Sequence, residues 1–67
     1  MEIIHFKVVR KYEKCRIYTM HPEFVDKAEW NIFGIPDREL TRVMCTITEK
    51  MDKLGYKCDF SLVNKND

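Results

Sequence analysis

Five side chains with soft or borderline metal-ligating atoms, cysteine sulfur or histidine nitrogen, are scattered along the sequence. They are His5, Cys15, His21, Cys45 and Cys58. No two of them have the C-x₂₋₄-C or H-x₃₋₅-H spacing of a zinc site. We therefore expect no metal and no cofactor, and we expect the core-facing cysteines to behave as small apolar residues.

Nucleophilic catalysis by a cysteine requires a histidine within hydrogen-bond reach. Cys15 and His5 lie on neighbouring strands of a predicted hairpin, but alternation directs their side chains to opposite faces. The carboxylates are spread at charge-neutralising spacings, and two glycines are too few for a phosphate-binding loop. The sequence therefore predicts a protein that is not an enzyme.

Basic side chains gather in the first third of the chain, on a predicted hairpin spanning residues 5–18. The candidate nucleic-acid-binding residues there are His5, Lys7, Arg10, Lys14, Arg16 and Tyr18. The cations would hold phosphates, and the two rings could stack on bases. The isoelectric point of about 7.7 is low for this function, and alternating Lys and Arg also protect an exposed strand edge. Nucleic-acid binding is therefore the alternative hypothesis.

Aromatic residues follow in an acidic stretch of the chain. The candidate protein-binding residues are Phe24, Glu29, Trp30, Ile32 and Phe33. Large aromatics dominate protein interfaces, and a charged rim improves partner choice. The other interpretation is that Trp30 closes the open end of a small core. Our leading hypothesis is a non-catalytic module that binds another protein as an adaptor, inhibitor or regulator, of the kind typical of bacterial or phage accessory proteins.

Charge is unevenly distributed although the net charge is only +1. Residues 1–20 hold five basic and two acidic side chains, which gives +3. Residues 21–40 hold two basic and five acidic side chains, which gives −3. Such a dipolar chain can orient a partner, or can simply keep two surfaces soluble.

Length and composition indicate one compact domain over residues 1–67, with 45% hydrophobic and 34% charged residues. A chain of this size buries only about 60% of its unfolded surface, so the core is small. No apolar run is long enough for a membrane span, and the N-terminus lacks the features of a signal peptide. Three widely spaced cysteines suit a reducing compartment. We therefore expect a cytoplasmic protein without a membrane partner.

Hydrophobic periodicity changes from 3.6 to 2 at Gly55. Apolar residues from Leu40 to Leu54 recur at helical spacing, and a strand with alternating residues follows over 57–63. Asp37 is a candidate N-cap for this helix, and Gly55 a candidate C′ residue. Two further strands are predicted near the N-terminus, at residues 3–9 and 15–20, and they should pair as a hairpin.

Residues 21–36 allow two interpretations. Pro22 can begin a short helical turn, which would place Phe24, Val25 and Ala28 on one face. Alternatively, residues 21–27 form a loop and residues 29–34 a third strand, because Trp30, Ile32 and Phe33 have high β-propensity. We favour the strand.

The predicted fold is α+β: a small three- to four-stranded, mainly antiparallel sheet, with one long helix (about 37–54) packed on one face, in the order β-β-(β)-α-β. The predicted core contains Ile4, Phe6, Val8, Ile17, Leu40, Val43, Met44, Ile47, Met51, Leu54, Phe60 and Leu62. The other face should present Ile3, His5, Lys7, Val9, Arg16, Tyr18, Met20, Asp59, Ser61 and Val63. Because this face is too apolar for simple solvation, we expect a homodimer.

Overall fold

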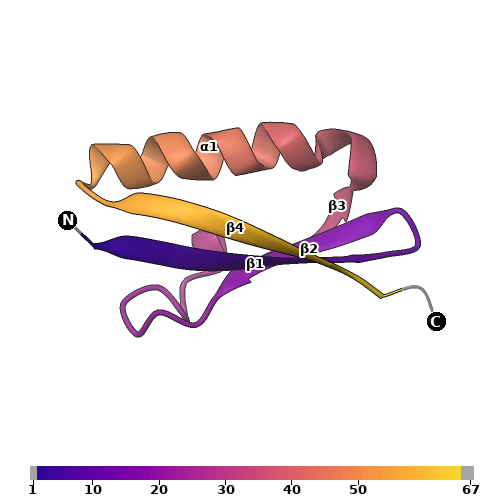
Figure 1. Cartoon of the computed structure of the whole chain (residues 1–67), viewed down its shortest axis with the longest axis horizontal. Helices are drawn as coiled ribbons and strands as arrows, with labels where there is room; N and C mark the ends of the chain where they lie inside the picture. Colours follow the sequence, from indigo (N-terminus) through magenta and orange to yellow (C-terminus); the bar gives the residue numbers. More distant parts are fainter. Residues whose placement is uncertain (1, 66–67) are drawn as a thin grey trace.

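A computed structural model describes residues 2–65 as a four-stranded sheet with a helix on one face (Figure 1). The elements are β1 (Ile3–Lys11), β2 (Lys14–Thr19), a 3₁₀ turn η1 (Ala28–Trp30), β3 (Ile32–Pro36), a 3₁₀ turn η2 (Asp37–Glu39), α1 (Leu40–Lys53) and β4 (Lys57–Asn64). The order of strands across the sheet is β3-β2-β1-β4. The predicted α+β fold and its element order are confirmed.

β1 lies between β2 and β4 and forms most of the sheet's centre. It pairs antiparallel with β2, with Val8 opposite Ile17. It pairs parallel with β4, with Phe6 opposite Phe60. The helix makes the crossover that a parallel pair requires. β2 and β3 are antiparallel, so the sheet is mixed with antiparallel pairings in the majority.

The β1–β2 hairpin turns through two residues that are not glycine. Tyr12 has a φ of 51° and Glu13 a φ of 65°, both in the left-handed region. This is the pattern of a type I′ turn, which normally contains Asn-Gly or a similar pair. The twist of this turn suits the hairpin. However, each L-amino acid other than glycine that adopts the left-handed conformation lowers the stability of the folded state by about 1–2 kcal/mol. The turn is therefore strained.

The third strand begins later than predicted. The structure has β3 at Ile32–Pro36 rather than 29–34, and Trp30 belongs to the preceding 3₁₀ turn. The register with β2 shifts by one residue between the Cys15–Ile35 and Ile17–Ile32 pairs. Gly34, with a φ of +69°, accommodates this bulge. β-Propensity alone does not detect either the late start or the bulge.

Asn31 explains why residues 21–31 form a loop. Its side-chain amide donates to the backbone carbonyls of Phe24 (3.0 Å) and Lys27 (2.7 Å). Its side-chain oxygen accepts a hydrogen bond from the backbone N–H of Thr19, at 3.1 Å. The loop begins with a turn in which the N–H of Val25 donates to the carbonyl of His21. Three hydrogen bonds to one side chain thus replace a strand ladder.

The helix ends as predicted but begins differently. Gly55 (φ +88°) donates to the carbonyl of Asp52, and Tyr56 donates to that of Met51, which is a Schellman motif. The predicted N-cap role of Asp37 is wrong, because its carboxylate faces Arg10 at 2.8 Å instead. Within residues 2–65, α1 is too short and too polar to cross a membrane.

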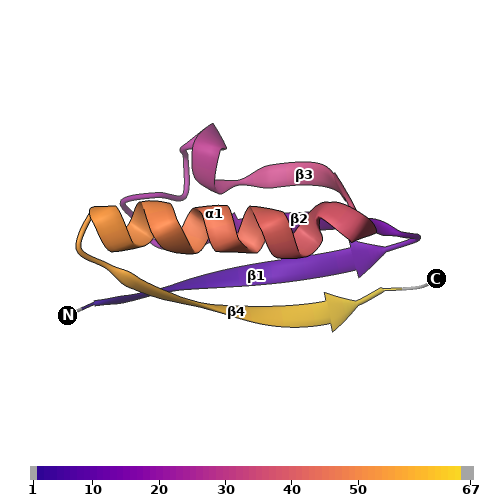
Figure 2. The same cartoon turned by 90° about the horizontal axis from the view of Figure 1, so that it is seen from above.

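The core lies between α1 and the inner face of the sheet. It contains Ile4, Phe6, Val8, Cys15, Ile17, Phe24, Trp30, Ile35, Leu40, Ile47 and Met51, with Val43, Met44 and Phe60 half-buried against it. The prediction is wrong for Leu54 and Leu62, which are 56% and 50% exposed. Leu62 belongs to the edge strand β4, and Figure 2 shows that α1 lies over the middle of the sheet while β4 runs along one side.

Replacing Glu13 with Gly should relieve the strained turn. We expect Glu13→Gly to raise the free energy of unfolding by about 0.5–1 kcal/mol, since glycine adopts positive φ without a steric penalty. The measurement is urea denaturation followed by circular dichroism. The matched control is Glu49→Gly, the same substitution on the exposed face of α1, which should lower the stability by about 1 kcal/mol. If the two substitutions changed the free energy of unfolding equally, the turn would not be strained.

Trp30 should be required for folding, whereas Phe33 should not. Trp30 is 3% exposed and its ring packs 5.5 Å from that of Phe24, between centroids. We expect Trp30→Ala to cost about 3–5 kcal/mol, by loss of buried surface and formation of a cavity. Phe33 is 72% exposed, so Phe33→Ala should change stability by less than about 1 kcal/mol. Thermal denaturation of both variants tests this difference, and similar melting temperatures would overturn it.

Candidate functional site

The sheet face opposite α1 is uncovered, and we call it the open face. Strand alternation directs to it the ten side chains predicted for this face: Ile3, His5, Lys7, Val9, Arg16, Tyr18, Met20, Asp59, Ser61 and Val63. The inner residues of the same strands, such as Phe6 and Ile17, are fully buried. Ile3 and Met20 are well exposed, so apolar and charged groups share this surface.

An arginine lies between two aromatic rings on the open face. The guanidinium of Arg16 lies 4.7 Å from the ring centroid of Tyr18 and 5.5 Å from that of Phe33. Both distances fall in the range of cation–π contacts. Tyr18 and Arg16 share one side of β2, and the bulge beside Gly34 brings Phe33 next to them. We call this set the aromatic column.

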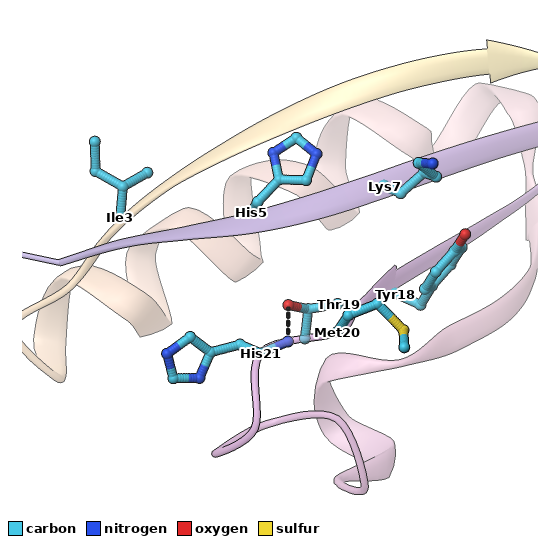
Figure 3. A pocket seen from close by; sticks show the side chains of 7 residues that line it. All are labelled: Ile3, His5, Lys7, Tyr18, Thr19, Met20 and His21. Carbon is cyan, nitrogen blue, oxygen red and sulfur yellow. Dashed lines mark hydrogen bonds between the residues drawn. The ribbon is translucent and has the colours of Figure 1, made fainter.

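A shallow groove of about 340 Å³ lies beside Tyr18, one member of the aromatic column (Figure 3). One side consists of Ile3, His5 and Lys7 from β1, and the other of residues 18–21 at the end of β2. Figure 3 shows Met20 and Tyr18 across the groove from His5 and Lys7. An apolar or flat chemical group would bury surface there, with a cation beside it.

His5 connects two side chains of β4 across the sheet. Its Nδ1 lies 2.6 Å from a carboxylate oxygen of Asp59, and its Nε2 lies 3.2 Å from the hydroxyl oxygen of Ser61. With the Nδ1 proton donated to the carboxylate, Nε2 accepts the hydrogen bond of the hydroxyl. The carboxylate therefore fixes which imidazole nitrogen faces the serine.

Positive charge predominates on the open face. Alternation places Lys7, Lys11, Lys14, Arg16 and Lys57 on this side, where the acidic residue of the described strands is Asp59. Glu2 contacts His21 at the end of the groove, with 2.6 Å between a carboxylate oxygen and Nε2. Glu39, Glu49 and Asp52 are on the helical segment, and Glu23 accepts a hydrogen bond from the Tyr56 hydroxyl at 2.8 Å. That hydrogen bond, followed by burial, raises the pKa of Tyr56.

The structure places five of the six candidate nucleic-acid-binding residues on the open face. They are His5, Lys7, Lys14, Arg16 and Tyr18, with Lys14 exposed at the hairpin end of β2. Arg10 points to the helix side, where its Nε lies 2.8 Å from Asp37. A contact with Cys15 and the charge of Asp37 raise the pKa of Arg10, although burial opposes this.

The five candidate protein-binding residues do not form one surface. Phe24 and Trp30 belong to the core, as the other interpretation of Trp30 predicted. Ile32 is half-buried against that core, and Glu29 is exposed beside it. Phe33 lies in the aromatic column instead. The acid-rimmed aromatic surface is therefore absent from the described residues 2–65.

The cysteines do not form a metal site. Cys15 is buried, Cys58 is half-buried, and Cys45 is exposed on α1, and all three are free. Among residues 2–65, no three His, Cys, Asp or Glu side chains are close enough together to hold a metal ion. The thiol of Cys15 donates to Asp37 at 3.7 Å, a structural contact.

Sequence reasoning missed the His5–Asp59–Ser61 set. His5 is separated from the other two by 54 and 56 residues, so no local motif connects them. The feature that connects them is the parallel pairing of β1 with β4. This pairing places Asp59 opposite His5, and Ser61 is two residues further along β4 on the same face. That register could not be fixed without the structure.

Comparisons with known proteins identify no relative that would assign a role to these residues. Neither a protein-family model nor a curated protein nor a solved structure matches the chain. Function must therefore be inferred from the geometry of the site.

Proposed function

We propose that this protein binds single-stranded nucleic acid on the open face of its sheet. The observation that carries the proposal is the aromatic column of Tyr18, Arg16 and Phe33 on a surface rich in cations. Bases stack on aromatic rings and on guanidinium planes, and each stacked base contributes about 1–3 kcal/mol. Lys7, next to the column, is placed to contact phosphates.

Single strands fit this surface better than a duplex does. The side chains of the aromatic column stand on a sheet face, and they can reach the flat side of a base only where the base is unpaired. The helical segment Asp37–Lys53 on the far side of the sheet carries four acidic and four basic side chains, so its net charge is zero. The excess of cations on the open face would therefore orient a polyanion toward that face. Three free cysteines support a reducing, cytoplasmic setting for this function.

Arg16→Glu should abolish nucleic-acid binding, because it removes the centre of the column and reverses its charge. The measurement is fluorescence anisotropy with labelled single-stranded DNA and RNA at two salt concentrations, with duplex DNA in parallel. For the wild type we expect tighter binding to single strands, and an affinity that falls as salt rises.

The matched control is Lys53→Glu, which makes the same charge change at an exposed position at the end of α1. It should bind nearly as well as the wild type. Equal losses in the two variants would indicate a net-charge effect, and a salt-independent affinity would exclude phosphate contacts. Either outcome would contradict the proposal.

A second candidate function is protein binding by self-association through β4. β4 is an edge strand, and an apolar groove of about 470 Å³ lies between it and α1, lined by Met44, Cys45 and Phe60 among others. The half-exposed Leu62 follows on the same side of the strand. A second copy of this chain would both extend the sheet and cover these groups.

The sequence of β4 is self-complementary when two copies pair antiparallel. With Phe60 opposite its symmetry mate, Cys58 of each copy lies opposite Leu62 of the other. Side chains of directly opposite residues point to the same face of a sheet. The inner face of the β4–β4 interface would therefore be apolar along its length. The helices of both copies would then lie on the same face of an eight-stranded sheet, and both open faces would stay free.

The dimer is tested by sedimentation equilibrium at micromolar concentration. We expect a mass of twice the 8.1 kDa of one chain, and a shift to the single-chain mass for Leu62→Glu. Leu54→Glu is the control, because Leu54 is similarly exposed but lies at the end of α1. A wild-type mass of one chain, or dissociation by both substitutions, would exclude this interface.

A further inference from the structure

We propose that Ser61, His5 and Asp59 form an acyl-transfer site that cleaves small esters. The chain of contacts runs from the Asp59 carboxylate through Nδ1 and Nε2 of His5 to the Ser61 hydroxyl, with distances of 2.6 and 3.2 Å. A base within hydrogen-bond reach of a hydroxyl, itself oriented by a third group, is the arrangement that activates a serine nucleophile. The nucleic-acid proposal neither requires nor explains it.

The backbone positions these groups firmly although the side chains are exposed. β1 and β4 pair in parallel over eight residue pairs, from Ile3–Lys57 to Arg10–Asn64. Asp59 and Ser61 are two residues apart on β4, so both point to the open face, and His5 stands opposite the first of them. Functional groups on paired strands are held more accurately than groups on loops.

Lys7 and Tyr18 indicate where a substrate would lie. Lys7 is opposite Ser61 on one side and opposite Tyr18 on the other, so these three form one row across the sheet. Neighbouring strands are about 4.8 Å apart, so the row spans about 10 Å from Ser61 to Tyr18. That length fits a short ester with a flat aromatic half placed in the groove beside Tyr18. The Lys7 ammonium lies between the two ends.

The reaction proceeds in two balanced steps. In the first, the Ser61 oxygen attacks the ester carbonyl carbon while His5 Nε2 takes the hydroxyl proton, and the positive charge of Lys7 stabilises the oxyanion. The C–O bond to the leaving group then breaks, and His5 returns the proton to the departing oxygen. In the second step, water attacks the acyl-serine with His5 again as base, and the carboxylic acid leaves while Ser61 regains its proton.

The experiment measures hydrolysis of 4-nitrophenyl butyrate and covalent labelling by a fluorophosphonate. For the wild type, we expect steady release of nitrophenolate and a label that peptide mass spectrometry assigns to Ser61. Ser61→Ala should lose the label and at least about tenfold in rate, and His5→Ala should do the same. Circular dichroism should show all variants folded, because the replaced side chains lie on the open face.

Asp59→Asn tests the positioning role of the carboxylate. The neutral amide in this variant no longer favours the tautomer of His5 that accepts the Ser61 proton, so kcat should fall while KM stays unchanged. Lys53→Glu, at an exposed position at the end of α1 and away from this row, should keep the wild-type rate. If Ser61→Ala hydrolyses the ester as fast as the wild type, His5 acts only as an exposed imidazole and the proposal is wrong. Absence of label on Ser61 would also overturn it.

Discussion

The constraint on which this structure depends is that a sheet has two faces and residues 2–65 supply one α-helix to cover them. α1 contributes Leu40, Ile47 and Met51 to a core that fills the space on one side. The loop that carries Phe24 and Trp30 closes the end of that core, so the large aromatics of the acidic stretch are used for folding. The open face is therefore left uncovered by the helix, and β4 is one of the two edge strands of the sheet.

Small departures from regular geometry decide what the open face presents. An extra residue at Gly34 brings Phe33 beside Arg16, where a regular strand would have put a different neighbour. The parallel register between β1 and β4 brings an acid and a hydroxyl to the two nitrogens of one imidazole. In both cases the chemistry arises from pairing between strands. The helix stabilises the sheet but contributes no group to either set.

The parts of the fold that follow from local patterns were predictable, and the parts that follow from distant contacts were not. Period-2 alternation identified the ten residues of the open face. The ability of Gly55 to adopt a positive φ located the end of α1. The late start of β3 escaped prediction because Asn31 holds the preceding loop through bonds to Thr19, Phe24 and Lys27. The role of Asp37 was misjudged because its partner, Arg10, is 27 residues away in the chain. The assignment of Phe24 and Trp30 to a surface failed because burial depends on how the loop closes.

The central position of β1 has a consequence for how the chain folds. Phe6 lies opposite Phe60, so the strand nearest the N-terminus is completed by one that the ribosome produces more than fifty residues later. The β1–β2 hairpin can form early, but until β4 arrives it exposes the edge of an apolar strand. Contacts so distant in sequence slow the search for the native state. During synthesis, the edge of β1 that will pair with β4 is therefore open to aggregation or to capture by a chaperone.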